Sequence, residues 1–336
     1  MQLFYGTTLD GLQMGLCFAI LALGLYISYT ILDFPDLSVD GTFPLGGVIC
    51  TILLYRAGLP PLVAIALSFF VGMAAGAVTG FLHVRFRISN LLSGIIVMTA
   101  LLSVNLALTT LLTPNGYTTT IFSYRGGNIE GLFSGSVTGL FGPGGKEYVI
   151  LLVLLVFVVA VKLLIDLFLR TKLGYLLRTA GENERVVTSL GRDAGRYKIL
   201  GLSLANGLVA VSGALYANLY NSYDNDSGSG KVVLALASVI IGMSVFSRLR
   251  HIRNTTAVIF GALIYSLCLN YLVLVDRNGM YLKLLNAILF ALILIFHDKL
   301  SALRRGGTRG GTPERVSGAE APEAGEIRGE EEDGHA

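Results

Sequence analysis

Three aspartates in the stretch DFPDLSVDG, residues 33–41, combine residue types and spacing that suit ion chemistry. Asp33, Asp36 and Asp40 stand there without a basic residue, and glycines and a proline follow at once. Carboxylates inside an apolar sequence can bind a cation or carry a proton. Irregular backbone at membrane depth occurs only where it faces protein or a water-filled cavity, as in transporter sites. The alternative is a plain solvated turn between two helices.

No phosphate-binding loop accompanies these acids. A P-loop requires the pattern G-x-x-x-x-G-K-[ST]. The string SGSGK at 227–231 has Asn225 at the first glycine position and Val232 after the lysine. The string GPGGK at 142–146 fails at the same two positions. The chain therefore encodes no ATP site, and any ATP must be hydrolysed by a partner.

Metal and nucleophile chemistry is equally absent from the sequence pattern. The histidines lie at the ends of apolar runs or near the C-terminus, and the cysteines lie inside apolar runs without metal-ligand spacing. We therefore expect no catalytic residue, no metal, no cofactor and no enzyme activity. The residues concerned are His83, His251, His297, His335, Cys17, Cys50 and Cys268.

Long apolar helices must hold these polar residues. Of the 336 residues 53% are hydrophobic and only 14% are charged, whereas soluble domains carry about a quarter charged residues. Several apolar runs reach the ~20 residues that cross a membrane as helix. We expect an all-α, polytopic membrane helical bundle of about 8–10 transmembrane helices in residues 1–300. A disordered cytoplasmic tail, 301–336, follows. The expected spans are 9–32, 43–56, 59–84, 91–113, 148–170, 199–220, 232–248, 254–275 and 280–297.

Basic residues in the loops predict the orientation of the bundle. Loops on one side of the expected spans are rich in Lys and Arg, and loops on the other side carry few. By the positive-inside rule the basic side is cytoplasmic, which places the N-terminus outside and the C-terminus inside. The basic segments are 85–87, 170–198, 248–253 and 299–305, and the others are 114–147, 221–231 and 276–279.

The segment 171–198 is a hydrophilic stretch between two long apolar runs. Glu182–Leu190 contains no Gly or Pro, and Gly191 follows where a glycine would end a helix. Apolar residues inside this helix recur at i, i+1 and i+4, which gives it one apolar stripe. A short amphipathic helix in a basic loop suggests a docking surface. The alternative is an ordinary cytoplasmic loop made basic by topology alone.

Other polar features each have two interpretations. Lys162 and Asp166 are four residues apart in the fifth span, where they either pair or form a proton relay. The segment 114–147 either faces a binding protein or is a surface loop without function. Polar residues within the fourth span either line a pathway or link helices. These last residues are Ser93, Thr99, Ser103 and Asn105.

Three stretches, taken in order, resemble the permease subunit of an ABC importer of the branched-chain amino acid and ribose type. From Leu173, LGYLLRTAGENERVVTSLGRDAGRYKILGLSLANGLVAVSGALYA is similar to the cytoplasmic loop and Gly/Ala-rich span of that family. DLSVDGTFPLGG at 36–47 is similar to its D-L-S-V-G-x motif, although Asp40 is inserted here. ALASVIIGMSVF at 235–246 is similar to the small-residue motif of its second half.

The resemblance implies a type II importer-like fold with a discontinuous second helix. It implies two permease subunits, identical or closely similar, in membrane lipid, each with a cytosolic ATPase subunit; a homodimer is the expectation. An external substrate-binding lipoprotein would deliver a small polar solute, an amino acid, and a similar subgroup of the family suggests an aromatic one. No nucleic acid is implied, and ATP is bound by the partner subunit.

The resemblance also implies roles for individual residues. A helix in the coupling loop 171–198 would seat in a groove of the ATPase, through Gly181, Glu182, Asn183, Arg185, Val186, Ser189, Leu190 and Gly191. The translocation pathway would involve Asp36, Ser38, Asp40, Gly41, Asn105, Ser238 and Gly242. The alternative function is an ion-coupled secondary transporter that uses Asp36, Asp40 or the Lys162 and Asp166 pair.

Overall fold

The computed structural model describes residues 2–110, 122–123, 132–133, 146–246, 253–275 and 284–295. In this part the chain is an all-α bundle, as predicted, apart from one short antiparallel strand pair, β1 (Phe122–Ser123) with β2 (Ser222–Tyr223). Seven of the described helices are long and apolar enough to cross a membrane, and two more are apolar but shorter. The chain is therefore a multi-pass membrane protein. The expected tail, 301–336, lies outside the described residues.

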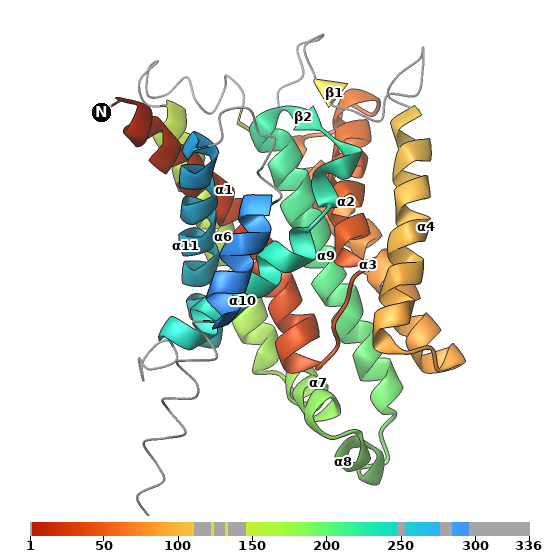
Figure 1. Cartoon of the computed structure of the whole chain (residues 1–336). Helices are drawn as coiled ribbons and strands as arrows, with labels where there is room; N and C mark the ends of the chain where they lie inside the picture. The colour runs from red at the N-terminus through yellow and green to blue at the C-terminus, as the bar shows by residue number, and fades with distance from the viewer. Residues whose placement is uncertain are drawn as a thin grey trace, which may run out of the picture.

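The described helices correspond one for one to the nine expected spans, with three shorter elements at turns (Figure 1). The first span ends in a π-helical turn, η1, and the second is the short helix α2. The bounds are α1 (Gln2–Leu25), η1 (Tyr26–Ile31), α2 (Val39–Tyr55), α3 (Pro61–Phe86), α4 (Asn90–Thr110), α6 (Lys146–Leu169), α7 (Lys172–Glu182), α8 (Glu184–Ser189), α9 (Ala194–Tyr220), η3 (Asn225–Gly228), α10 (Lys231–Phe246), α11 (Asn254–Val275) and Leu284–Ile295.

The helix α9 lies at the centre of the bundle and packs against α1, α2 and α3. Its sequence is rich in Gly, Ala and Ser, which lets neighbouring backbones approach closely. On the facing helix, a Cβ added at Gly76 would overlap the carbonyl oxygen of Leu202, and one added at Gly72 would lie 2.6 Å from the carbonyl oxygen of Asn206. Small residues therefore fix the contact between α3 and α9.

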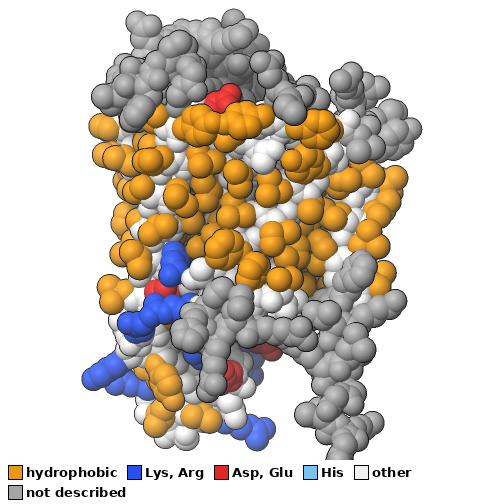
Figure 2. Space-filling view, turned by 90° about the vertical axis from the view of Figure 1, so that its left-hand side faces the viewer, with side chains coloured by type: hydrophobic (Ala, Val, Ile, Leu, Met, Phe, Trp, Pro, Cys, Tyr) orange, Lys and Arg blue, Asp and Glu red, His pale blue; other side chains and the backbone are white. Residues whose placement is uncertain are grey.

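The surface divides into an apolar band and a charged end. Figure 2 shows hydrophobic side chains around the middle of the molecule and Lys and Arg side chains gathered below them. We call the end that carries α7 and α8 the basic end, and the end where α1 begins the opposite end (Figure 1). Exposed cations on the basic end include Arg87, Arg170, Arg178, Arg185 and Arg192.

A buried acid joins α6 to the start of α11. Asp166 accepts a hydrogen bond from the Thr255 hydroxyl at 2.7 Å, and the Arg253 guanidinium donates to it at 3.0 Å. The ammonium of Lys162 lies 3.1 Å from the same carboxylate, so the predicted pair is confirmed. Two cations and a hydroxyl thus satisfy this carboxylate, which favours a structural clamp over a proton relay.

Replacing Asp166 by alanine is expected to destabilise the bundle by about 2–4 kcal/mol, because two partly buried cations lose their carboxylate. Thermal unfolding in detergent measures this as a lower midpoint. The control is Glu182→Ala, which removes an exposed acid and is expected to change stability by about 0.5 kcal/mol or less. Equal midpoints for the two variants would contradict the clamp.

Candidate functional site

The predicted docking helix is broken at Asn183, so the expected helix Glu182–Leu190 is wrong in its start. Asn183 has an extended backbone with φ −157° and ψ 102°, and it ends α7 and begins α8. Its side-chain oxygen accepts a hydrogen bond from the backbone N–H of Arg185 at 3.0 Å. Asparagine is a strong N-cap residue, and its side chain competes for the bond that would continue α7. Glu182 therefore belongs to α7, and α8 begins at Glu184.

The other end of α8 is closed as predicted by Gly191. This glycine has φ +70°, in the left-handed region. Its N–H bonds to the Thr188 carbonyl at 2.9 Å, and the N–H of Arg192 bonds to the Val187 carbonyl at 3.2 Å. These two bonds form a Schellman motif, which satisfies the last carbonyl groups of a helix. The chain can then turn into α9, where Asp193 caps the first turn.

Only one residue of the predicted apolar stripe on α8 faces the protein. Val187 is fully buried and packs with Ala180 and Ala194. Val186 is 44% exposed and Leu190 is 61% exposed. The outer face of α8 therefore presents apolar side chains to the surroundings. Four other residues predicted to contact the ATPase are also exposed: Glu182, Asn183, Arg185 and Ser189.

The inner side of this element is fixed to the end of the first span through Gly181. A Cβ added at Gly181 would overlap the carbonyl oxygen of Ile31, the last residue of η1, and would lie 2.8 Å from the Cα of Leu32. On α9, a Cβ added at Gly201 would meet the side-chain ends of Leu32 and Leu177 at 2.5 and 2.8 Å. The α7–α8 element therefore lies directly on the backbone that leads into the segment between the first two spans.

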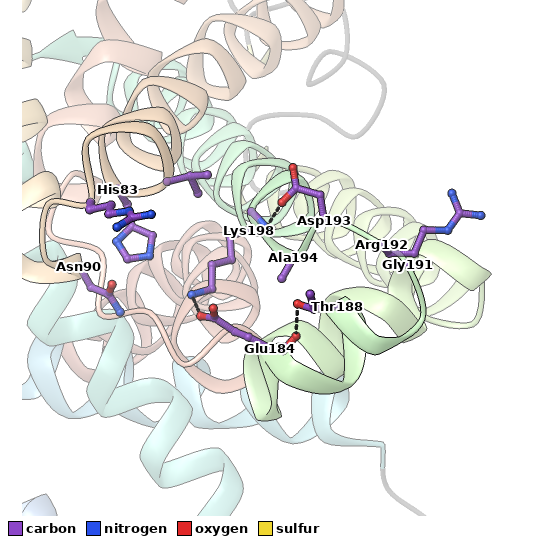
Figure 3. Close-up of a pocket in the computed structure, with 12 residues that line it drawn as sticks. His83, Asn90, Glu184, Thr188, Gly191, Arg192, Asp193, Ala194 and Lys198 are labelled. Carbon is purple, nitrogen blue, oxygen red and sulfur yellow. Dashed lines mark hydrogen bonds and ion pairs between the residues drawn. The ribbon is translucent and has the colours of Figure 1, made fainter.

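A hollow of about 900 Å³ opens beside α8, between the start of α9 and the end of α3 (Figure 3). An ion pair between Glu184 and Lys198 ties α8 to α9 inside it. On the facing wall, the ring of His83 packs edge-on against the buried Phe34 at 5.2 Å. Charged and polar side chains line much of the hollow, and His83 connects it to the segment between the first two spans through Phe34.

That segment, residues 32–38, is anchored in the protein interior by the carboxylate of Asp36, whereas Asp33 and Pro35 are exposed. Asp36 is 1% exposed, and it accepts hydrogen bonds from the Asn206 amide at 2.7 Å and the Ser38 N–H at 2.8 Å. The Ser38 hydroxyl donates in turn to the Asn206 side-chain oxygen at 3.2 Å. We call Asp36, Ser38 and Asn206 the buried triad. It fixes the discontinuity before α2 to the central helix α9.

The start of α10 contacts the start of α2 through Asp40, which lies in the first turn of α2. Its two carboxylate oxygens accept hydrogen bonds from the backbone N–H groups of Gly230, at 3.1 Å, and Val232, at 2.8 Å. These groups belong to the start of α10, which runs through the lower half of the bundle in Figure 1, whereas α2 lies in the upper half. The helices α2 and α10 thus meet at their N-termini, and Asp40 complements the partial positive charge at the start of α10.

The remaining residues predicted for the pathway lie in helix contacts. The Asn105 amide donates to the Gly41 carbonyl at 3.0 Å, joining α4 to α2. Ser238 and Gly242 face α11, where a Cβ at Gly242 would overlap the carbonyl oxygen of Ala257. All of these side chains or glycines are buried, and their role in a pathway stays a prediction.

The structure thus brings the predicted residues into two connected groups. Gly181 to Gly191 form a surface element, and Asp36 to Gly41 form an interior junction that lies next to it through Ile31 and Leu32. Asn206 was absent from the predicted site. The signal for it was present in the sequence, because an amide stands inside the apolar run LANGL.

The chain matches known families and proteins over most of its length. Residues 7–306 match the family described as branched-chain amino acid transport system / permease component. A tyrosine transport system permease protein of Clostridioides difficile (strain R20291) is 39% identical over 283 residues, 84% of this chain and 88% of that protein. The uncharacterized protein RP368 of Rickettsia prowazekii (strain Madrid E) is 30% identical over 295 residues, 85% of this chain and 96% of that protein.

A more distant relative is the probable branched-chain amino acid transport permease protein LivH of Methanocaldococcus jannaschii. It is 27% identical over 198 residues, 58% of this chain and 61% of that protein. No solved structure matches the chain.

Proposed function

The chain belongs to the permease component family of branched-chain amino acid transport systems, and we propose that it is the transmembrane subunit of an ABC importer for an amino acid. In this proposal a separate cytosolic subunit hydrolyses ATP, and an external binding protein delivers the solute. A second copy of the chain completes the pathway. The single observation that carries the proposal is the exposed apolar face of α8 on an otherwise basic end.

The charge distribution supports an orientation with the basic end in the cytoplasm. Cations exposed beside the apolar band belong on the cytoplasmic side by the positive-inside rule. The N-terminus then lies outside, because α1 begins at the opposite end (Figure 1). This orientation presents α8 to a cytosolic partner.

Exposed apolar residues on a soluble, charged surface mark a contact site. Val186 and Leu190 lie on one side of α8, between the flanking cations Arg185 and Arg192. The cap at Asn183 and the Schellman motif at Gly191 hold this face in one conformation. A rigid apolar face with a basic rim suits a groove with apolar centre and acidic edges on the ATPase subunit.

The packing behind α8 supports a direct mechanical link to the interior. Movement of α7 and α8 pushes on Ile31 and Leu32, because Gly181 leaves no space between the two backbones. The next residues lead to Asp36 and the buried triad. ATPase closure at the basic end would therefore act on the junction where α2 and α10 meet.

The relatives support an amino acid as the solute. One is named as a tyrosine permease and another as a branched-chain amino acid permease. We propose an aromatic amino acid, because the tyrosine permease matches 84% of the chain at 39% identity.

An ion-coupled carrier is supported less well by the geometry. Its acids would have to exchange ions or protons during transport. Asp36, Asp40 and Asp166 instead accept hydrogen bonds that hold separate helices together. Loss of those bonds at each transport cycle would break the helix junctions themselves.

The docking face is tested by the double substitution Val186→Asp and Leu190→Asp. Tagged chain is purified from native membranes, and ATP hydrolysis by the copurifying subunit is measured. We expect the wild-type complex to hydrolyse ATP and the variant to lose about tenfold or more of this activity, because interface centres carry most of the binding free energy.

The matched control is Phe4→Asp, an equally exposed apolar residue at the opposite end. This variant is expected to keep the ATP-hydrolysing subunit. If the α8 variant also keeps it, or the wild-type chain purifies without ATP hydrolysis, the docking proposal is wrong.

A further inference from the structure

Lys231, the last residue of the SGSGK string, has an unusual environment at the start of α10. Its side chain is half-buried at the junction of α2 and α10, beside the cap formed by Asp40. Among the described residues, none accepts a hydrogen bond or ion pair within contact distance from its ammonium group. Both Asp40 oxygens accept backbone N–H groups, and the charge of Asp40 acts on the ammonium from beyond contact distance.

The ammonium lies instead among aromatic rings. It is 4.3 Å from the ring centroid of Phe18 and 5.2 Å from those of Phe43 and Tyr216. Phe18 and Phe43 are fully buried. Cation–π contacts stabilise such an ammonium but leave its donors without acceptors. A carboxylate that reaches the accessible side of Lys231 would supply the missing acceptor.

Aromatic rings lead from this ammonium to the opposite end of the bundle. Tyr216 stacks on Phe18 with centroids 5.8 Å apart, and Tyr220 lies 4.7 Å beyond Tyr216. Tyr220 is 42% exposed. In the described part of the chain, no residue hydrogen-bonds to the hydroxyl of either tyrosine. The two rings therefore offer a half-exposed aromatic surface beside the cation.

We propose that Lys231, Tyr216 and Tyr220 form a binding site for an aromatic amino acid within the permease. Lys231 binds the solute carboxylate, and the two tyrosine rings pack on its aromatic ring. The site lies where the start of α10 meets the discontinuity before α2, a common place for solutes in transporters. This inference rests on the proposed importer function and adds a specificity-determining residue to the membrane subunit.

The test measures binding by saturation-transfer difference NMR to the full chain in lipid nanodiscs. The probes are L-phenylalanine, phenethylamine, which lacks the carboxylate, and L-leucine, which lacks the ring. We expect saturation of the L-phenylalanine ring above that in empty nanodiscs. Phenethylamine and L-leucine are each expected to give about tenfold less, as for the loss of one good contact.

The variants separate recognition from packing. Lys231→Met keeps the apolar stem and is expected to remove the preference for L-phenylalanine over phenethylamine, whereas Lys231→Arg keeps it. Tyr220→Leu is expected to weaken ring saturation. Tyr148→Leu, an exposed tyrosine on α6, is the matched control and is expected to leave binding unchanged.

Two outcomes would overturn the site. One is an L-phenylalanine signal no greater than in empty nanodiscs, and the other is an unchanged preference in Lys231→Met. Retained ATP hydrolysis by the native complex in either case would show that the importer function stands and only this site fails. Should Lys231→Met not fold, the comparison of Tyr220→Leu with Tyr148→Leu decides.

Discussion

Replacing Gly181 by valine is expected to lower ATP-driven solute uptake about tenfold or more while the ATPase subunit still binds. The loss follows from the clash of the new side chain with the backbone at Ile31 and Leu32, which must move the α7–α8 element off the first span. A coupling free energy of about 1–3 kcal/mol corresponds to such a change. The outer face of α8 is untouched, so docking and ATP hydrolysis should persist.

Uptake of labelled amino acid by a deletion strain that carries the variant measures the first effect, and copurified ATP hydrolysis measures the second. Gly6→Val is the matched control, because an added side chain there meets no atom within 4 Å. The proposed link through Gly181 is refuted by normal uptake in Gly181→Val. Loss of both uptake and the ATPase subunit would also refute it, since α8 would then have been disturbed directly.

Replacing Asn206 by aspartate is expected to be the most destabilising single change at the junction, at about 3 kcal/mol or more. The carboxylate of Asp36 would lose its amide donor and face a second carboxyl group in the interior. The second substitution Asp36→Asn should restore stability. In that double variant the amide at 36 donates to the acid at 206 and still accepts from the Ser38 N–H.

Unfolding midpoints and uptake are both measured for Asn206→Asp, Asp36→Asn and the exchanged pair. The account predicts recovery of both quantities in the exchanged pair, because the triad holds the segment before α2 to α9. If the exchanged pair is no more stable than Asn206→Asp, the bond between the two residues is not what holds the junction. Recovery of stability without uptake would assign Asp36 a direct part in transport and contradict a purely positioning role.

The fold class could be predicted because each membrane span is recognisable from its own apolar sequence, without reference to the other spans. Apolar length identified the spans independently of one another, and Gly191 marked the end of α8 through its need for a positive φ. The start of α8 was misplaced because an asparagine can either continue one helix or cap the next, and the sequence does not decide between the two. The break depends on the Asn183 side chain, whose oxygen accepts a hydrogen bond from the backbone N–H of Arg185 and so caps α8.

The junctions could not be predicted, because their partners are far apart in the sequence. Asp36 meets Asn206 across 170 residues, and Asp40 meets Val232 across 192. A buried polar residue in an apolar run is expected to have a hydrogen-bond partner, but its position in the sequence does not identify which residue that partner is. Lys231 was likewise assigned to an outer loop, since the packing of the start of α10 against α2 appears only when the bundle is assembled.

In the proposed mechanism this chain moves solute only when an ATPase docks on α8. Uptake of labelled L-tyrosine into proteoliposomes measures this dependence. Uptake is expected when the chain is reconstituted with its ATPase subunit, binding protein and ATP, and none is expected when Val186→Asp and Leu190→Asp are present. Uptake by the chain alone, driven by an imposed proton or sodium gradient, would contradict this mechanism.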